Sequence, residues 1–223
     1  MFDQQFVPLF SRLNEVTAEE MAVRVMVSIV TALSTYLLFQ AIYSGSAVVM
    51  MASGLNSVES WRPLFGSFTQ CTSLRGVWNQ FRHQGMVTTL TVPARYITTK
   101  VFRLPRATII QRYAYIMVVF QLSGLVHIVG DVAAGVDIKD SGVMQWFSVQ
   151  ALGFAIEDSV SWLWRILTGR RDDEARTWQK GLGFIWVVAC FVWTMPVWTF
   201  PISRVSEGEG ILPFSLIQPF IAT

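Results

Sequence analysis

The chain has 223 residues, of which 52% are hydrophobic and only 14% charged, and its mean hydropathy is +0.45. Soluble domains carry about 25% charged residues, so this composition excludes an ordinary soluble protein and indicates a single integral membrane domain. The net charge is only +2, and two cysteines, Cys71 and Cys190, are too few for a disulfide framework or a metal cluster. We expect both thiols to be reduced.

The N-terminal segment, residues 1–21, is interpreted as interfacial. Its start, MFDQQFVPLFSRLNEV, has no basic leader before an apolar stretch and no small-residue cleavage site, so we expect no cleaved signal peptide. Phe2, Phe6, Phe10 and their apolar neighbours can form one face that lies at the membrane surface. The first span would then be an uncleaved anchor.

Four windows are long enough to cross a bilayer, which takes about 20 apolar residues. They are residues 22–43, 113–135, 142–167 and 181–200. The stretch SGSAVVMMASGL after the first window is too short for another span and is interpreted as a helix extension or an interfacial segment. The sequence therefore predicts an all-α integral membrane helical bundle of about four transmembrane helices plus interfacial helices over residues 22–203, followed by a tail, 204–223.

The basic residues are distributed unevenly between the connections. With four spans, thirteen of the 17 Lys and Arg residues fall in or beside the connections 44–112 and 168–180, and four fall on the other side. Because cytosolic connections carry the excess of positive charge, both long connections are predicted to be cytosolic and both termini lumenal. We expect a multi-pass protein of the endoplasmic reticulum.

The first long connection is basic over most of its length. There is no acidic residue between Glu59 and Asp131, and seven basic residues run from Arg75 to Arg112. Such a segment suits anionic lipid headgroups or a phosphorylated substrate such as a coenzyme A thioester or a diphosphate. It lies beside spans rather than in a soluble arm, so a nucleic acid partner is not expected.

Ionisable residues inside the spans point to a functional site more specifically. Inserting each of them into the bilayer costs about 2.5 to 3.5 kcal/mol, and such a residue usually faces a cavity or a partner. They are His127, Asp131, Glu157 and Asp158. Asp131 follows His127 by four residues, which places both on one helix face. A carboxylate there can fix the imidazole tautomer and raise its basicity, as suits a general base.

Depth in the membrane suggests which polar residues meet. At about 1.5 Å per residue, His127 and Gln150 lie at a similar level, roughly 21 Å from the cytosolic end of the second span. Gln121 and Glu157 share a shallower level, about 12 to 13 Å deep. We therefore expect the second and third spans to line one polar shaft. Each group could instead form only an interhelical hydrogen bond.

Three motifs carry a family resemblance. Residues 61–84, WRPLFGSFTQCTSLRGVWNQFRHQ, are similar to a WPPLFG…SLRxFWxRxWHQ signature. SGLVHIVGD (123–131) is similar to SGLLHxxG, and QALGFAIEDSV (150–160) to QxxxxxxED. In order and spacing the chain resembles the wax-synthase-like branch of the membrane-bound O-acyltransferases, over roughly residues 55–200. Members of that branch are longer, and we expect the chain to correspond to about their second half.

The resemblance implies an acyltransferase that moves an acyl group, which we expect to be acetyl, from an acyl-CoA co-substrate to a hydroxyl of a lipophilic or terpenoid acceptor. It implies His127 as catalytic base, and we add Asp131 and Glu157 as catalytic candidates. No covalent acyl-enzyme and no tightly bound cofactor are expected. The predicted substrate-binding residues are Trp78, Asn79, Arg82, His83, Gln84, Gln121, Gln150 and Asp158.

Two other functions stay open, since Arg82 and Val77 replace aromatic residues of the first signature. An integral-membrane terpene cyclase or isomerase would use Glu157 or Asp158 as acid and aromatic faces to stabilise carbocations. A non-catalytic scaffold would only dock on another membrane protein. No metal is predicted, because neither His83 nor His127 has a second His or Cys at ligand spacing. The expected partners are the lipid bilayer and a small lipophilic substrate, and an oligomer is left open.

Overall fold

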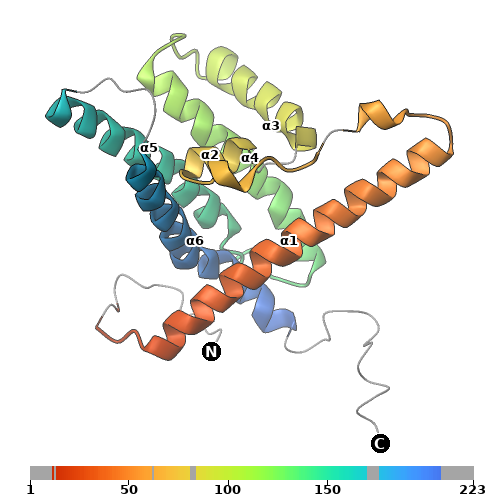
Figure 1. The fold of residues 1–223 in the computed structure, drawn as a ribbon, viewed down its shortest axis with the longest axis horizontal. Coiled ribbons are helices and arrows are strands. Elements are labelled where there is room, and N and C mark those ends of the chain that lie inside the picture. The colour runs from red at the N-terminus through yellow and green to blue at the C-terminus, as the bar shows by residue number, and fades with distance from the viewer. Residues whose placement is uncertain (1–11, 13, 62, 81–83, 170–175, 207–223) are drawn as a thin grey trace, which may run out of the picture.

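A computed structural model describes residues 12, 14–61, 63–80, 84–169 and 176–206. The described residues form helices and no strand, so the predicted all-α fold is confirmed (Figure 1). Short helical turns of the described residues include η3 (Val58–Ser60), η4 (Phe68–Gln70) and the π-helical η5 (Ile97–Val101). The α-helices found in the same residues are α1 (Ala18–Ala52), α2 (Leu74–Gln80), α3 (Gln84–Tyr96), α4 (Ile109–Ala133), α5 (Val143–Thr168) and α6 (Thr177–Ser206).

Among the described residues, three helices are long and apolar enough to cross a membrane, namely Ala18–Ala52, Ile109–Ala133 and Thr177–Val205. The protein is therefore an integral membrane protein. The predicted window 142–167 does form a helix, α5, but this helix is not among the three. Its 26 residues would suffice in length, whereas Gln150, Glu157 and Asp158 make it too polar. By length and composition, three of the four predicted windows thus give apolar spans, and α5 is a more polar helix of sufficient length.

Local sequence signals fix where the helices begin and end. The hydroxyls of Thr17 and Thr108 accept hydrogen bonds from backbone N–H groups in the first turns of α1 and α4. Helix α5 stops at Gly169, whose φ of +63° suits a residue without a Cβ. The stretch SGSAVVMMASGL continues α1 to Ala52, so the predicted helix extension is confirmed.

The antiparallel helices α4 and α5 form the centre of the fold, and α6 packs along α5 (Figure 1). The short α2 lies on α5, and α3 lies on α4. Close contact depends on small residues: a Cβ on Gly124 of α4 would lie 2.6 Å from the sulfur of Met144 on α5. Gly124 is thus a close-packing residue.

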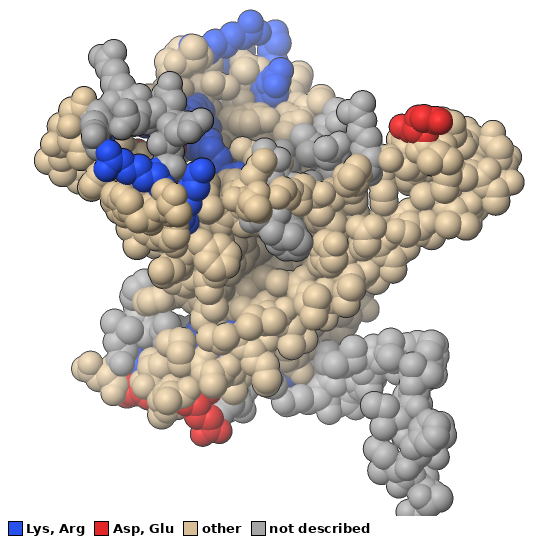
Figure 2. All heavy atoms as spheres, viewed as in Figure 1, with Lys and Arg blue, Asp and Glu red and all other residues tan. Residues whose placement is uncertain are grey.

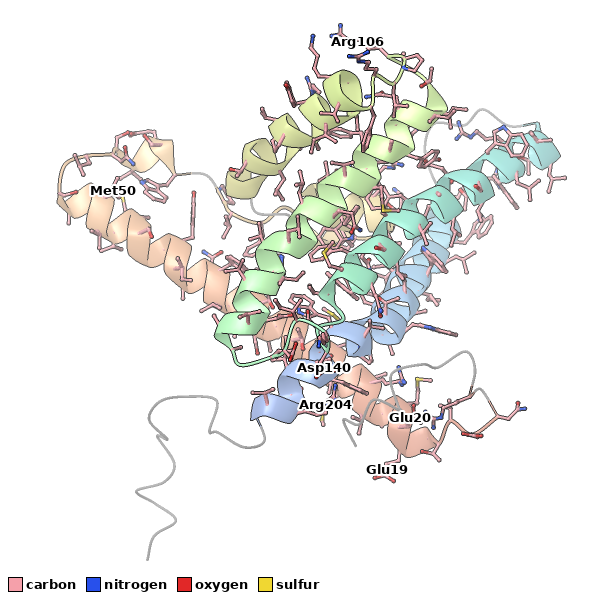
Figure 3. The ribbon with its side chains drawn as sticks, turned by 180° about the vertical axis from the view of Figure 1, so that it is seen from behind. Glu19, Glu20, Met50, Arg106, Asp140 and Arg204 are labelled. Carbon is pink, nitrogen blue, oxygen red and sulfur yellow. The ribbon has the colours of Figure 1, made fainter. Side chains whose placement is uncertain are left out.

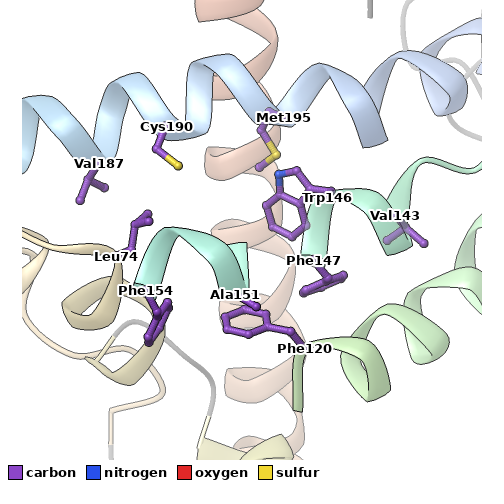
Figure 4. Packing of buried hydrophobic residues seen from close by; sticks show 10 residues of the cluster. All are labelled: Leu74, Phe120, Val143, Trp146, Phe147, Ala151, Phe154, Val187, Cys190 and Met195. Carbon is purple, nitrogen blue, oxygen red and sulfur yellow. The ribbon is translucent and has the colours of Figure 1, made fainter. Parts of the chain in front are cut away.

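The core is an aromatic cluster between α4, α5 and α6, closed on one side by Leu74 of α2 (Figure 4). In lipid the hydrophobic effect does not drive helices together, so van der Waals contact and interhelical hydrogen bonds must stabilise this bundle. Large flat rings suit that requirement, since each offers many contact atoms. The cluster comprises Leu74, Phe120, Val143, Trp146, Phe147, Ala151, Phe154, Val187, Cys190 and Met195.

Helix α1 is organised differently. It crosses α6 near its start and then runs away from the bundle (Figure 1). Its 35 residues span about 52 Å, against a hydrocarbon core of about 30 Å. Near the crossing, the buried Arg24 pairs with Glu20 at 3.0 Å and lies over the ring of Phe200. Beyond it the helix exposes apolar residues such as Leu33 and Leu37, which suits contact with lipid.

Charge is separated between the two ends of the molecule. Lys and Arg gather at the end that holds the connection between α3 and α4 (Figure 2). Arg106 marks this end, whereas Glu19, Glu20, Asp140 and Arg204 lie at the opposite end (Figure 3). The described residues therefore keep the asymmetry predicted from the sequence. The assignment of the basic end to the cytosol stays a prediction.

Candidate active site

His127 lies in the second half of α4, and its ring is fixed by its own helix. Nδ1 is 2.8 Å from the carbonyl oxygen of Ser123, one turn earlier. A carbonyl can only accept a hydrogen bond, so Nδ1 donates and carries the proton of the neutral ring. The second nitrogen, Nε2, then has the free lone pair, and within the described part of the chain it has no hydrogen-bond partner. This tautomer is the one that can accept a proton at Nε2.

Two aromatic rings from other helices pack against this imidazole. The ring centroid of Phe147 on α5 is 4.9 Å away, and that of Trp198 on α6 is 5.2 Å away with its plane nearly perpendicular. Aromatic faces exclude water and also attract a cation. The histidine is therefore held where three helices meet.

Asp131 does not perform the predicted task. We expected its carboxylate to fix the tautomer of His127, but the Ser123 carbonyl does so. The Asp131 side chain, only 3% exposed, accepts hydrogen bonds from the indole N–H of Trp198 (3.0 Å) and from the hydroxyl of Ser141 (2.5 Å). It connects α4 to α6 and to the residues just before α5. Its catalytic role stays a prediction.

The expected polar shaft is wrong for these side chains. Gln150 is fully buried, yet its amide bonds Trp78 of α2 at 3.4 Å and Thr194 of α6 at 3.0 Å rather than meeting His127. Gln121 donates to Ser148 at 2.8 Å instead of meeting Glu157. Equal depth along a helix does not fix the direction in which a side chain points. Residues at the same depth on neighbouring helices therefore need not meet.

A cavity of about 260 Å³ lies between α2, α3 and α4. The predicted binding residues Trp78 and Asn79 both line it. Its inner part reaches Ser123, and His127 follows one turn later, on the same face of α4. The lining combines apolar side chains with hydroxyl, amide and guanidinium groups. The lining residues are Arg75, Trp78, Asn79, Leu90, Thr91, Tyr115, Ile116, Val119, Phe120, Ser123 and Phe154.

Glu157 anchors α2 to the bundle. Its carboxylate accepts the backbone N–H of Leu74, the backbone N–H of Arg75 at 3.3 Å and the indole N–H of Trp186 at 3.1 Å. The first two are N–H groups that a helix start leaves without a partner in the helix itself. All three donors need an acceptor, so the contacts of Glu157 are those of a structural carboxylate rather than of an acid.

Asp158 forms an ion-pair cluster beside it. The guanidinium of Arg75 approaches both carboxylate oxygens, at 3.0 and 2.9 Å. Arg112 donates to the same carboxylate at 3.0 Å, and the hydroxyl of Tyr113 donates to it at 2.8 Å. Arg75 also lies over the ring of Phe154, 5.0 Å from its centroid, at the edge of the cavity. Asp158 thus holds a cavity-lining arginine and does not itself line the cavity.

Three predicted binding residues cannot be placed. Arg82 and His83 lie outside the described residues, and so does the side chain of Gln84. They follow α2, which carries Trp78 and Asn79. Their roles in binding stay predictions.

The hydrogen bonds around His127, Glu157 and Asp158 do not involve the side chain of either cysteine. Both are free thiols, as expected. Burial raises the pKa of the Cys71 thiol, which keeps it in the unreactive form. In the described part of the chain no three His, Cys, Asp or Glu residues are grouped so that they could hold a metal ion.

Sequence reasoning missed four residues that organise the site: Arg75, Ser141, Trp186 and Trp198. Tryptophans in membrane spans commonly form a belt at the interface, so residue type alone does not mark these two as hydrogen-bond donors to a carboxylate. Arg75 looked like one of many basic loop residues. The available signal was that Asp131, Glu157 and Asp158 each needed donors at bilayer depth, and an indole N–H is one of the few donors that an apolar helix offers.

The chain is similar to proteins of known family. The family described as membrane bound O-acyl transferase matches residues 61–149. Three relatives carry the name acetyltransferase: aurG of Calcarisporium arbuscula (34% identical over 199 residues), atnC of an Arthrinium species (35% over 205) and fsoF of Humicola fuscoatra (30% over 229). These matches cover 89%, 91% and 96% of this chain but 48%, 47% and 54% of the relatives. The chain thus spans about half of their length. No solved structure matches it.

Proposed function

The chain belongs to the membrane bound O-acyl transferase family, and on that premise we propose that it transfers an acyl group, acetyl first of all, from an acyl-CoA to a hydroxyl of a lipophilic or terpenoid acceptor. The observation that carries the proposal is the state of His127. Its Nδ1 donates to the Ser123 carbonyl, which leaves Nε2 as an acceptor. The names of the relatives support acetyl as the group transferred.

The proposed reaction needs one base and no covalent enzyme intermediate. Nε2 of His127 takes the proton of the acceptor hydroxyl while its oxygen attacks the thioester carbonyl carbon. A new C–O bond forms, the C–S bond breaks, and the departing sulfur takes the proton back from the imidazolium. The rings of Phe147 and Trp198 stabilise that transient cation.

The cavity beside α2 is proposed to hold a substrate next to this base. Its apolar lining residues Ile116, Val119 and Phe120 suit a hydrocarbon skeleton. Asn79 of α2 and Tyr115 of α4 offer hydrogen bonds that can orient a hydroxyl or a thioester. Arg75 at its edge suits an anionic part of a coenzyme.

The alternatives gain less support. A cyclase that protonates its substrate needs a carboxylic acid facing a cavity, whereas Glu157 faces three N–H donors and Asp158 faces two arginines. A mere scaffold would not need a histidine with an accepting nitrogen at bilayer depth. We keep the endoplasmic reticulum as the proposed membrane and assign the basic end to the cytosol.

The test uses the chain purified in detergent, with acetyl-CoA labelled in its acetyl group and a panel of terpenoid and long-chain alcohols. Mass spectrometry should find the label in an ester of one acceptor. An isomerised or cyclised hydrocarbon without label would instead support the cyclase. Absence of both products, with a full-length relative active in parallel, would contradict the proposal for this chain.

A further inference from the structure

We infer that Trp198, anchored by Asp131, is a positioning residue that holds the imidazole of His127 in its base-competent orientation. The inference rests on the proposed function for its catalytic meaning, although the orientation itself can be measured without activity. It assigns to Asp131 an indirect task, which replaces direct contact with the histidine.

The anchor is a buried hydrogen-bonded chain across three segments. Asp131 is 3% exposed, and its two oxygens accept from Trp198 on α6 and from Ser141 just before α5. Removing one partner of a buried hydrogen bond leaves a desolvated group unpaired, so each member is strongly tied to the others. The indole ring therefore has one favoured orientation.

That indole in turn restricts the histidine. Its plane stands at 85° to the imidazole with centroids 5.2 Å apart, and Phe147 contacts the same ring. If the imidazole turned by half a rotation about its bond to Cβ, Nδ1 would leave the Ser123 carbonyl and Nε2 would move away from its present position. Rings packed at these distances on two sides oppose such a rotation. Trp198 thus preserves the Nδ1–H tautomer that the Ser123 bond selects.

Two pairs of variants separate anchoring from a direct charge effect. Trp198→Phe keeps a ring but removes the N–H donor, and Asp131→Ala removes the acceptor. Asp131→Asn can keep both bonds, because its amide oxygen accepts from Trp198 and its amide N–H donates to Ser141.

We expect Trp198→Phe and Asp131→Ala to lower kcat by about 10- to 100-fold with KM for acetyl-CoA unchanged, the usual scale for a misplaced group. Asp131→Asn should restore most of the turnover. Trp162→Phe, at an exposed position on α5, is the matched control.

Nitrogen NMR gives the readout that does not depend on activity. The chain has only two histidines, so ¹⁵N-histidine labelling yields two imidazole systems, and His127→Gln identifies one of them. The wild type and Asp131→Asn should show a protonated Nδ1 and an unprotonated Nε2 at His127. Trp198→Phe and Asp131→Ala should show a mixture of tautomers.

Unchanged tautomers and unchanged kcat in both disruptive variants would overturn the inference. Equal damage by Asp131→Asn and Asp131→Ala would overturn it too, because the carboxylate would then act through its charge. If His127→Ala leaves turnover intact while the tautomer still depends on Trp198, the proposed function fails and the positioning stands.

Discussion

Two polar clusters on α4 and α5 differ in what they leave available. The α2 cluster consists of Glu157 and Asp158 with the backbone of α2, Trp186, Arg75, Arg112 and Tyr113. The histidine cluster consists of His127 and Asp131 with Ser123, Ser141 and Trp198. In the first, both carboxylates are occupied by donors that tie helices together. In the second, the contacts lead from Asp131 through Trp198 to the imidazole of His127, whose Nε2 has no hydrogen-bond partner in the described part of the chain.

The difference separates stability from chemistry. A side chain whose bonding capacity is filled by neighbouring elements stabilises their arrangement, and it has nothing left for a substrate. A side chain whose neighbours fix its direction but leave one polar atom open can react. We therefore expect substitutions in the α2 cluster to change stability first, and substitutions in the histidine cluster to change turnover first.

The largest expected effect is at the open nitrogen. His127→Ala should lower turnover by roughly 10² to 10⁴, the usual worth of a positioned base. The purified variant should keep its yield in membranes and its elution in gel filtration, because the ring makes a single hydrogen bond. Val129→Ala, on an exposed part of α4, is the control. Normal turnover in His127→Ala would make the histidine an interhelical packing residue only.

Next comes the carboxylate that holds α2. Glu157→Gln replaces an acceptor oxygen by an N–H₂ group facing N–H donors, so we expect a cost of about 1 to 3 kcal/mol in the free energy of unfolding. The denaturation midpoint in detergent should fall clearly, while turnover of the remaining folded protein falls only modestly. Loss of nearly all activity with an unchanged midpoint would instead restore Glu157 as an acid and favour the cyclase.

A smaller effect is expected at Asp158. Its ion pairs with Arg75 and Arg112 are partly exposed, with side-chain exposures of 26% for the aspartate and 35% and 53% for the arginines. Exposed pairs contribute about 0.2 to 1 kcal/mol each, so Asp158→Asn should lower stability by about 1 kcal/mol. Because Arg75 lines the cavity, KM for the acyl donor should rise more than kcat falls. A change in kcat alone would contradict the structural role.

Much of this fold could be predicted from the sequence because long apolar windows have few alternatives to helices in a bilayer. The contacts of the two clusters could not. The bond from Trp198 to Asp131 joins residues 67 positions apart, and the bond from Leu74 to Glu157 spans 83. The spacing of four between His127 and Asp131 suggested a direct pair, and the actual acceptor, the backbone carbonyl of Ser123, leaves no trace in residue identity. The polar residues of α5 were visible in its sequence, but the window was predicted to be a span because it is long enough to cross a bilayer.

The smallest expected effect concerns Cys71, which belongs to neither cluster. It lies outside the spans, just before α2, and burial raises the pKa of its thiol. A raised pKa means that the thiolate forms only at higher pH, so alkylation by iodoacetamide should be slow at pH 8 and should still increase as the pH rises beyond 9. If acyl transfer proceeds directly to the alcohol, Cys71→Ser should keep turnover close to wild type. A burst of acetyl label on Cys71, or a loss of turnover in Cys71→Ser as large as that in His127→Ala, would show a covalent route and would move the chemistry away from the histidine cluster.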